Sequence, residues 1–129
     1  MNDAEDLLIR QRILLVDDSE VVREMVKSVL EEAGFEVSTH PSPFGFSRSV
    51  MRDHLDLVLM DVSMPALNGD KLVEIAIRNG FAKCPIVLFS DRPPHELAML
   101  ARRCGADGYI AKTQDARALV QAVTRFISA

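Results

Sequence analysis

The sequence has few cysteines and lacks long apolar runs. Its two cysteines, Cys84 and Cys104, form no Cys-x-x-Cys pair, and no histidine stands at metal-ligand spacing from them. This pattern argues against a zinc site or a disulfide framework. The strongly apolar runs span four or five residues, far short of the roughly 18 needed to cross a bilayer. We therefore expect two reduced, partly buried thiols and no membrane insertion.

Concentrated positive charge is also missing. Fifteen Lys and Arg residues stand against 19 Asp and Glu residues, giving a net charge of -4, and beyond the N-terminal region the only adjacent basic pair is Arg102 with Arg103. A protein that binds nucleic acid through phosphates usually carries a basic stripe, so we expect no direct nucleic-acid contact. The segment Met1 to Gln11 has neither the basic start nor the apolar stretch of a signal peptide, which favours a cytoplasmic location.

The length and composition fit one compact domain. The chain has 129 residues, 48% of them hydrophobic, and shows no internal repeat, linker or low-complexity segment. We expect residues 1–11 to form a flexible N-terminal extension and residues 12–129 to form the domain.

Short apolar segments predict the strands of a parallel sheet. Three quartets are bulky and lack polar alternation, as is typical of strands buried on both faces, and two weaker segments resemble them. In chain order these segments are Ile13–Val16, Phe35–Thr39, Leu57–Met60, Ile86–Phe89 and Tyr109–Ala111.

Helical patterns separate the strands. The clearest has Ser19 as its N-cap, Gly34 as its stop and an apolar stripe of Val22, Met25, Val26, Val29, Leu30 and Ala33. Four more helices are expected at about 44–52 and 70–79, around Leu97 to Cys104, and around Leu119 to Ile127 at the end. Strands that alternate with helices predict an α/β three-layer sandwich, with helices on both faces of a five-stranded parallel sheet.

Polar side chains follow four of the predicted strands. Asp17 and Asp18 follow the first, Asp61 the third, Ser90 the fourth and Lys112 the fifth. Parallel strands end at the same edge of a sheet, where ligands usually bind, so these side chains should converge. Each alone has an ordinary explanation, such as a turn former or a solvated charge, but their joint placement favours a functional site.

Three converging carboxylates need a cation. Two carboxylates ~4 Å apart repel by roughly 4 kcal/mol at an effective dielectric constant near 20. Hard oxygen ligands favour Mg²⁺, which commonly completes its shell with water and phosphate oxygens, and this points to phosphoryl chemistry. One aspartate can itself form an aspartyl-phosphate, while Lys112 neutralises charge and Ser90 donates to a phosphoryl oxygen.

The segments that carry these residues resemble the receiver domain of two-component response regulators. The similarity extends from about Ile13 to Ile127. It lies in the run Ile-Leu-Leu-Val-Asp17-Asp18-Ser19, in the Asp-x-x-Met-Pro-x-x-x-Gly motif from Asp61 to Gly69, in Ser90, and in the segment from Gly105 to Lys112. The resemblance implies a flavodoxin-like sheet of order 2-1-3-4-5 with five flanking helices.

The resemblance also implies specific roles. Asp61 would accept a phosphoryl group from a histidine kinase or phosphotransfer protein, and Lys112 would contact that group. Mg²⁺ would be held by Asp17, Asp18, Asp61 and the backbone carbonyl of Ser63.

A switch is implied as well. Ser90 would move toward the phosphoryl group as Tyr109 turns inward, and the face of the fourth helix, fifth strand and fifth helix would bind a downstream protein. Such a domain is not an enzyme beyond catalysing its own phosphorylation and dephosphorylation.

Two positions depart from the family pattern. Asp91 stands where a small residue usually borders the entrance to the site, so we expect it to slow phosphoryl entry by repulsion. Thr113 replaces the proline that usually follows Lys112 through a cis bond. A non-proline cis bond costs ~2.5 to 4 kcal/mol, which leaves a trans Lys112–Thr113 bond or a displaced lysine. Pro93 and Pro94 are expected to stiffen the loop that follows Asp91.

Three alternatives deserve comparison. A pseudo-receiver that docks a partner without phosphorylation is favoured by Asp91 and Thr113 and disfavoured by the complete polar set. A phosphohydrolase of the haloacid dehalogenase type resembles Asp-x-Asp at the first strand and carries a cap, whereas Asp17 and Asp18 are adjacent and the chain has no room for a cap. A flavodoxin would bind a flavin phosphate where this chain has an acidic loop.

Overall fold

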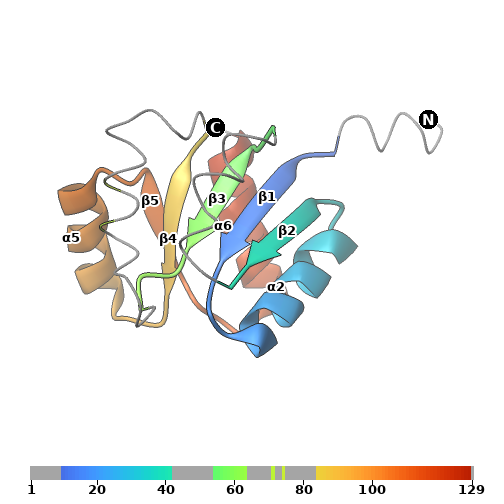
Figure 1. Cartoon of the computed structure of the whole chain (residues 1–129), viewed down its shortest axis with the longest axis horizontal. Helices are drawn as coiled ribbons and strands as arrows, with labels where there is room; N and C mark the ends of the chain where they lie inside the picture. Colours follow the sequence, from blue (N-terminus) through green and yellow to red (C-terminus); the bar gives the residue numbers. More distant parts are fainter. Residues whose placement is uncertain (1–9, 42–53, 64–70, 72–73, 75–83, 129) are drawn as a thin grey trace.

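The protein is an α/β domain built on a parallel five-stranded sheet. The computed structural model describes residues 10–41, 54–63, 71, 74 and 84–128. The strands lie in the order β2-β1-β3-β4-β5, as the sequence predicts (Figure 1). Their bounds are Arg12–Val16 for β1, Glu36–His40 for β2, Leu57–Met60 for β3, Ile86–Ser90 for β4 and Gly108–Ala111 for β5.

Helices cover both faces of the sheet. The described helices are α2 (Glu20–Glu32), α5 (Pro94–Cys104) and α6 (Ala116–Ser128). Figure 1 shows α5 on one face, and α2 and α6 on the other. The helices expected at about 44–52 and 70–79 lie outside the described residues, apart from Lys71 and Glu74, as does most of the expected extension 1–11. None of the described helices is long and apolar enough to span a membrane.

Alternate residues of each central strand enter two separate cores. Leu14 and Val16 of β1 pack on the α5 side, whereas Ile13 and Leu15 pack on the side of α2 and α6. All four are fully buried. Burying such a side chain stabilises the fold by roughly 1.5 to 3 kcal/mol, so both faces of the sheet contribute and the strands are rigid supports for the residues that follow them.

The first helix begins and ends where the sequence predicts. The Oγ atom of Ser19 accepts a hydrogen bond of 3.2 Å from the backbone N–H of Val22. Gly34 follows the C-cap with a φ of 103°, a conformation that residues with a Cβ rarely adopt. The predicted apolar stripe is too wide, because Met25 is 37% exposed while Val26 is fully buried.

The two prolines lie where the loop after β4 meets helix α5. Pro93 is the N-cap of α5, and Pro94 occupies the first turn, where its missing N–H costs no intrahelical bond. The loop that was expected to include both prolines therefore ends at Pro93.

Candidate functional site

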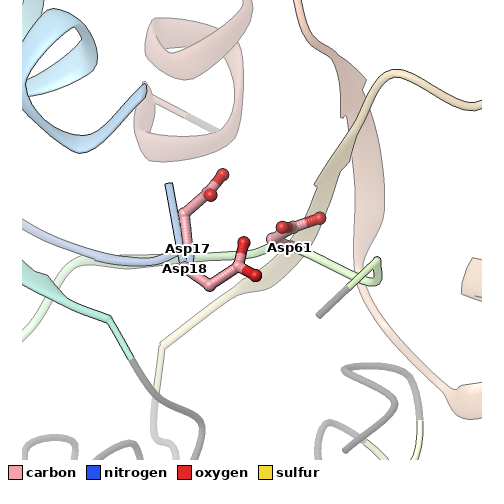
Figure 2. Close-up of side chains that lie close together, drawn as sticks. All are labelled: Asp17, Asp18 and Asp61. Carbon is pink, nitrogen blue, oxygen red and sulfur yellow. The ribbon is translucent and has the colours of Figure 1, made fainter. Parts of the chain in front are cut away.

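The structure brings three aspartates together at the carboxyl edge of the sheet. Asp17 and Asp18 follow β1, and Asp61 follows β3 (Figure 2). One carboxylate oxygen from each lies within 4.8 Å of the others. Asp17 and Asp61 are buried, with 0% and 2% of their surfaces exposed, whereas Asp18 is exposed.

Backbone N–H groups orient the two buried carboxylates. Oδ1 of Asp17 accepts a hydrogen bond of 2.9 Å from the N–H of Ser19, and Oδ1 of Asp61 accepts one of 2.9 Å from the N–H of Ser63. Each aspartate thus closes a small turn on itself, a local geometry that Asp favours. The Oδ2 atoms remain for contacts within the site.

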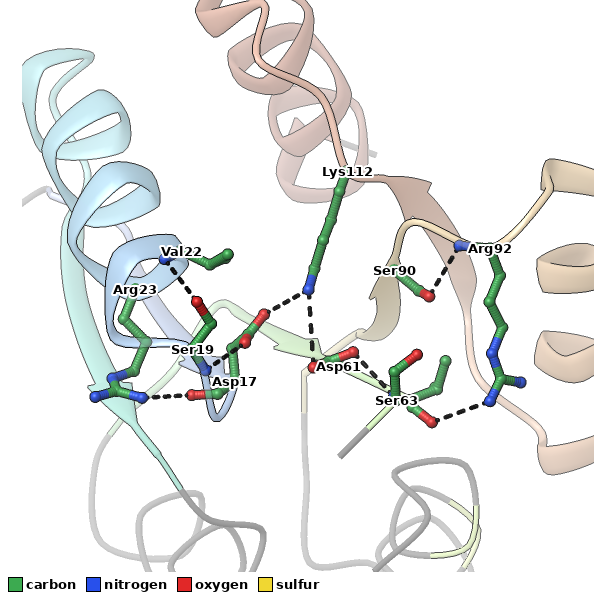
Figure 3. A network of polar contacts seen from close by, with 10 residues as sticks. Asp17, Ser19, Val22, Arg23, Asp61, Ser63, Ser90, Arg92 and Lys112 are labelled. Atoms are coloured by element: carbon green, nitrogen blue, oxygen red, sulfur yellow. Dashed lines mark hydrogen bonds and ion pairs between the residues drawn. The ribbon is translucent and has the colours of Figure 1, made fainter. Parts of the chain in front are cut away.

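Lys112 lies between these Oδ2 atoms. Its Nζ is 2.9 Å from Oδ2 of Asp17 and 3.7 Å from Oδ2 of Asp61 (Figure 3). The backbone N–H of Lys112 donates to the carbonyl of Ser90, which joins the ends of β5 and β4, and the ammonium lies 5.5 Å from the centre of the Phe89 ring. No peptide bond in the described residues is cis, so Lys112 reaches both carboxylates with a trans bond to Thr113.

Ser90 is the last residue of β4, not the first residue after it as the sequence predicts. Its side chain is fully buried, and its Oγ accepts a hydrogen bond of 3.1 Å from the N–H of Arg92. The Arg92 guanidinium donates a hydrogen bond of 3.5 Å to the backbone carbonyl of Val62 (Figure 3). It also lies 3.6 Å from the carboxylate of Glu96. The β4–α5 loop is thereby connected to the loop that carries Asp61.

Two arginine contacts were missed by sequence reasoning. Besides Arg92, the guanidinium of Arg23 donates a hydrogen bond of 2.8 Å to the backbone carbonyl of Asp17. The sequence pattern places Arg23 on the polar face of α2, where most charged residues only meet solvent. Nothing in the pattern distinguishes it from its neighbours, because the contact is to a backbone atom whose direction the fold decides.

The pKa values of Asp61 and Lys112 are both raised, for different reasons. Burial raises the pKa of the Asp61 carboxyl, and the charges of Asp17 and Asp18 add to this, against the Ser63 hydrogen bond and Lys112. Burial on its own lowers the pKa of Lys112, but its neighbouring carboxylates, Asp17 foremost, outweigh burial and raise it. Lys112 therefore stays a cation.

These residues fit a hard divalent cation. Oδ2 of the buried Asp17 accepts no hydrogen bond from the described residues, and its described partner is the Lys112 ammonium. Three carboxylates with one ammonium leave an excess of negative charge. Carboxylate oxygens from one or two residues, with water and phosphate oxygens, are the usual ligands of Mg²⁺.

The buried polar side chains gather at this site. Among the described residues, the buried residues with polar or charged side chains are Asp17, Asp61 and Ser90. Burying a polar or charged group costs desolvation energy unless it is hydrogen-bonded or paired. The fold therefore pays this cost at one edge of the sheet, which indicates a functional site there.

Tyr109, the remaining predicted switch residue, lies on β5 and is half-buried. It pairs in register with Leu88 and packs against the core on the α5 side. No hydrogen bond joins it to Ser90 in the described part of the chain.

The comparison with protein families agrees with this geometry. Residues 13–124 match the model of the response regulator receiver domain. The chain belongs to this family of two-component signalling domains.

Known relatives and structures support the assignment. The chain is 33% identical over 108 residues to the transcriptional regulatory protein CseB of Streptomyces coelicolor, covering 84% of this chain and 45% of CseB. It is 29% identical over 118 residues to the chemotaxis protein CheY of Bacillus subtilis, covering 91% of this chain and 98% of CheY. The structure of Vibrio cholerae CheY4 overlays with a TM-score of 0.81 at 25% identity, covering 91% of this chain and 98% of CheY4.

Many relatives are longer than this chain. It spans 45% of CseB and 22% of the regulatory protein AtoC of Escherichia coli, to which it is 37% identical over 106 residues. The family assignment therefore concerns the receiver domain that these proteins share.

Proposed function

We propose that Asp61 is the phosphoacceptor of a working receiver. It would take a phosphoryl group from the phosphohistidine of a histidine kinase or phosphotransfer protein, with Mg²⁺ as cofactor. The observation that supports this most is the gathering of the buried Asp17, Asp61 and Ser90 around Lys112, because a domain that only docks a partner has no need of buried charges.

The residues have separable roles in the transfer. An oxygen of Asp61 attacks phosphorus, the P–N bond of the phosphohistidine breaks, and the imidazole keeps the electron pair and takes a proton. The Ser63 N–H fixes the Asp61 carboxylate, and Lys112 neutralises charge on the phosphoryl oxygens.

The carboxylates of Asp17, Asp18 and Asp61, with the carbonyl of Ser63, would hold the metal. When bound there, Mg²⁺ supplies further stabilisation of the charge on the transferring group. The contribution of the chain is to hold these oxygens in place before the donor arrives.

Phosphorylation would then shift the domain between two conformations. The Ser90 hydroxyl, now an acceptor for the Arg92 N–H, would donate to a phosphoryl oxygen, and Tyr109 would turn inward. The face of α5, β5 and α6 would change with it. A cavity of about 710 Å³ between β5 and α6, lined in part by Tyr109 and Phe126, supports this face as the one that meets a downstream protein.

The cell context follows from the same proposal. Output would pass through a protein partner in the cytoplasm, and the domain would catalyse only its own phosphorylation and dephosphorylation. The receiver domain would comprise residues 12–129.

Intact mass after incubation with Mg²⁺ and a small phosphodonor tests the proposal. Phosphoramidate and acetyl phosphate are used separately, with Asp61→Asn as the matched variant. The expected result is one added phosphoryl group in the parent and none in the variant. An equal gain in both would place the acceptor elsewhere. No gain in a folded parent with either donor would favour a docking module that acts without phosphorylation.

A further inference from the structure

An additional carboxylate shares a pocket with Lys112 next to the site. Asp91 is exposed and directly follows the buried Ser90. Together with Lys112 and with Val22 and Met25 of α2, it lines a pocket of about 450 Å³. Lys112 is also the ammonium that faces Asp17 and Asp61, so this pocket borders the charged site and shares Lys112 with it.

The charge of Asp91 is not compensated locally. In the described part of the chain Asp91 forms no hydrogen bond and no short ion pair, unlike its neighbour Arg92, which pairs with Glu96. Its field nevertheless acts on Lys112, alongside the fields of Asp17 and Asp61. Asp91 therefore adds negative potential where a phosphodonor must approach.

Asp91 changes the net charge around Lys112 by one unit. Asp17, Asp18, Asp61 and Asp91 are four carboxylates around one ammonium. A bound divalent cation would leave one net negative charge, and without Asp91 the site would be neutral. Fields at the mouth of a cleft alter the encounter rate of charged ligands, and the effect grows with the charge of the ligand.

We propose that Asp91 is a specificity-determining residue that disfavours small dianionic phosphodonors relative to donors that carry a compensating positive charge. The inference rests on the proposed function, because it concerns the donor that reaches Asp61. Asp91 acts through the field at the entrance and touches no reacting atom.

Two small phosphodonors differ in net charge and transfer the same phosphoryl group. Acetyl phosphate is a dianion near neutral pH, whereas phosphoramidate carries a protonated nitrogen and is a monoanion. With either donor an oxygen of Asp61 forms the new P–O bond. The bond that breaks is the P–O bond to acetate or the P–N bond to ammonia, and the leaving group keeps the electron pair.

The test compares initial phosphorylation rates with both donors at saturating Mg²⁺. Asp91→Asn removes the charge and keeps the size, and Glu32→Gln is the matched control, since Glu32 is exposed at the far end of α2. We expect Asp91→Asn to raise the acetyl phosphate rate about threefold to tenfold at low ionic strength. The phosphoramidate rate should rise about twofold or less, and salt should reduce both gains.

Several outcomes would overturn the inference. It fails if Asp91→Asn and the parent react equally with acetyl phosphate, or if both donors gain equally without salt dependence. Asp91→Ala resolves size from charge: a gain in the alanine variant alone would mean that Asp91 blocks the entrance by its bulk. If neither donor labels the parent or any Asp91 variant, the proposed function itself fails, and this inference with it.

Discussion

The ammonium of Lys112 lies closer to Asp17 than to Asp61, at 2.9 Å against 3.7 Å. Asp17 is fully buried, and the Lys112 side chain is 21% exposed. Without a metal, Lys112 is therefore chiefly the counterion of Asp17, and its contact with the proposed phosphoacceptor is secondary.

Removing this counterion should destabilise the metal-free domain. Lys112→Ala leaves the buried Asp17 carboxylate without its ion pair, which we expect to cost about 1 to 3 kcal/mol, less than a fully buried pair because Lys112 is partly solvated. Mg²⁺ should restore part of the loss. Urea unfolding with and without Mg²⁺ measures both effects, and Lys27→Ala, an exposed lysine of α2, is the control. Equal stability of Lys112→Ala and parent without Mg²⁺ would contradict the assignment.

Replacing Asp61 should stabilise the metal-free domain, whereas replacing Lys112 should destabilise it. Burial, followed by the charges of Asp17 and Asp18, raises the pKa of Asp61 in the folded state. A carboxyl whose pKa is higher folded than unfolded favours folding when protonated, and this contribution is lost as pH rises from its unfolded pKa through its folded pKa. We therefore expect Asp61→Asn to stabilise the metal-free domain near neutral pH by about 0.5 to 2 kcal/mol.

The pH dependence provides the check. As pH falls through the folded pKa of Asp61 toward its unfolded pKa, the folded parent becomes protonated at Asp61 and the advantage of Asp61→Asn should shrink. Denaturant unfolding of both proteins in a chelator, from neutral to acidic pH, measures the difference. An advantage that stays constant over this range would show that the ionisation of Asp61 is not its source.

The central sheet could be predicted from the sequence because its strands are buried on both faces. A continuous apolar run such as Leu57 to Met60 is compatible with few other environments, and all four residues are fully buried. The site followed from the same logic, since parallel strands end at one edge. The end of β4 could not be predicted in the same way. Pairing of Ser90 with Ala111 extends β4 by one residue, and the local sequence pattern does not contain this partner strand.

Contacts between distant side chains and backbone could not be predicted. The apolar periodicity of α2 predicts that Met25 and Val26 are equally buried. Met25 instead lies at the border of the apolar stripe, beside the pocket near Lys112. The contacts of Arg23 and Arg92 to carbonyl groups depend on the path of two loops. Periodicity determines which face of a helix is buried, but it carries no information on such directions.

Arg23 should act as a positioning residue for the metal. Its hydrogen bond to the Asp17 carbonyl fixes the peptide that joins Asp17 to Asp18. Arg23→Lys keeps the charge and removes the planar fork, so we expect Mg²⁺ affinity to fall about tenfold, at the low end of effects seen for groups that orient metal ligands. Titration of Mg²⁺ followed by NMR measures the affinity. Arg23→Gln removes the charge as well as the fork, so its comparison with Arg23→Lys isolates the charge. Unchanged affinity in Arg23→Lys with a gain in Arg23→Gln would mean that Arg23 acts only by repelling the cation.

Cys84 should be a slow nucleophile although it is only half-buried. Burial raises the pKa of its thiol to about 11, and the nearby carboxylates of Asp56 and Asp107 add to the effect. Only the thiolate reacts, so alkylation by iodoacetamide should accelerate about tenfold per pH unit between about pH 8 and pH 10. Peptide mass mapping resolves Cys84 from the more deeply buried Cys104, which should react more slowly for want of access. A rate for Cys84 that reaches a plateau by about pH 9 would indicate an unperturbed thiol, because a free cysteine is then largely ionised.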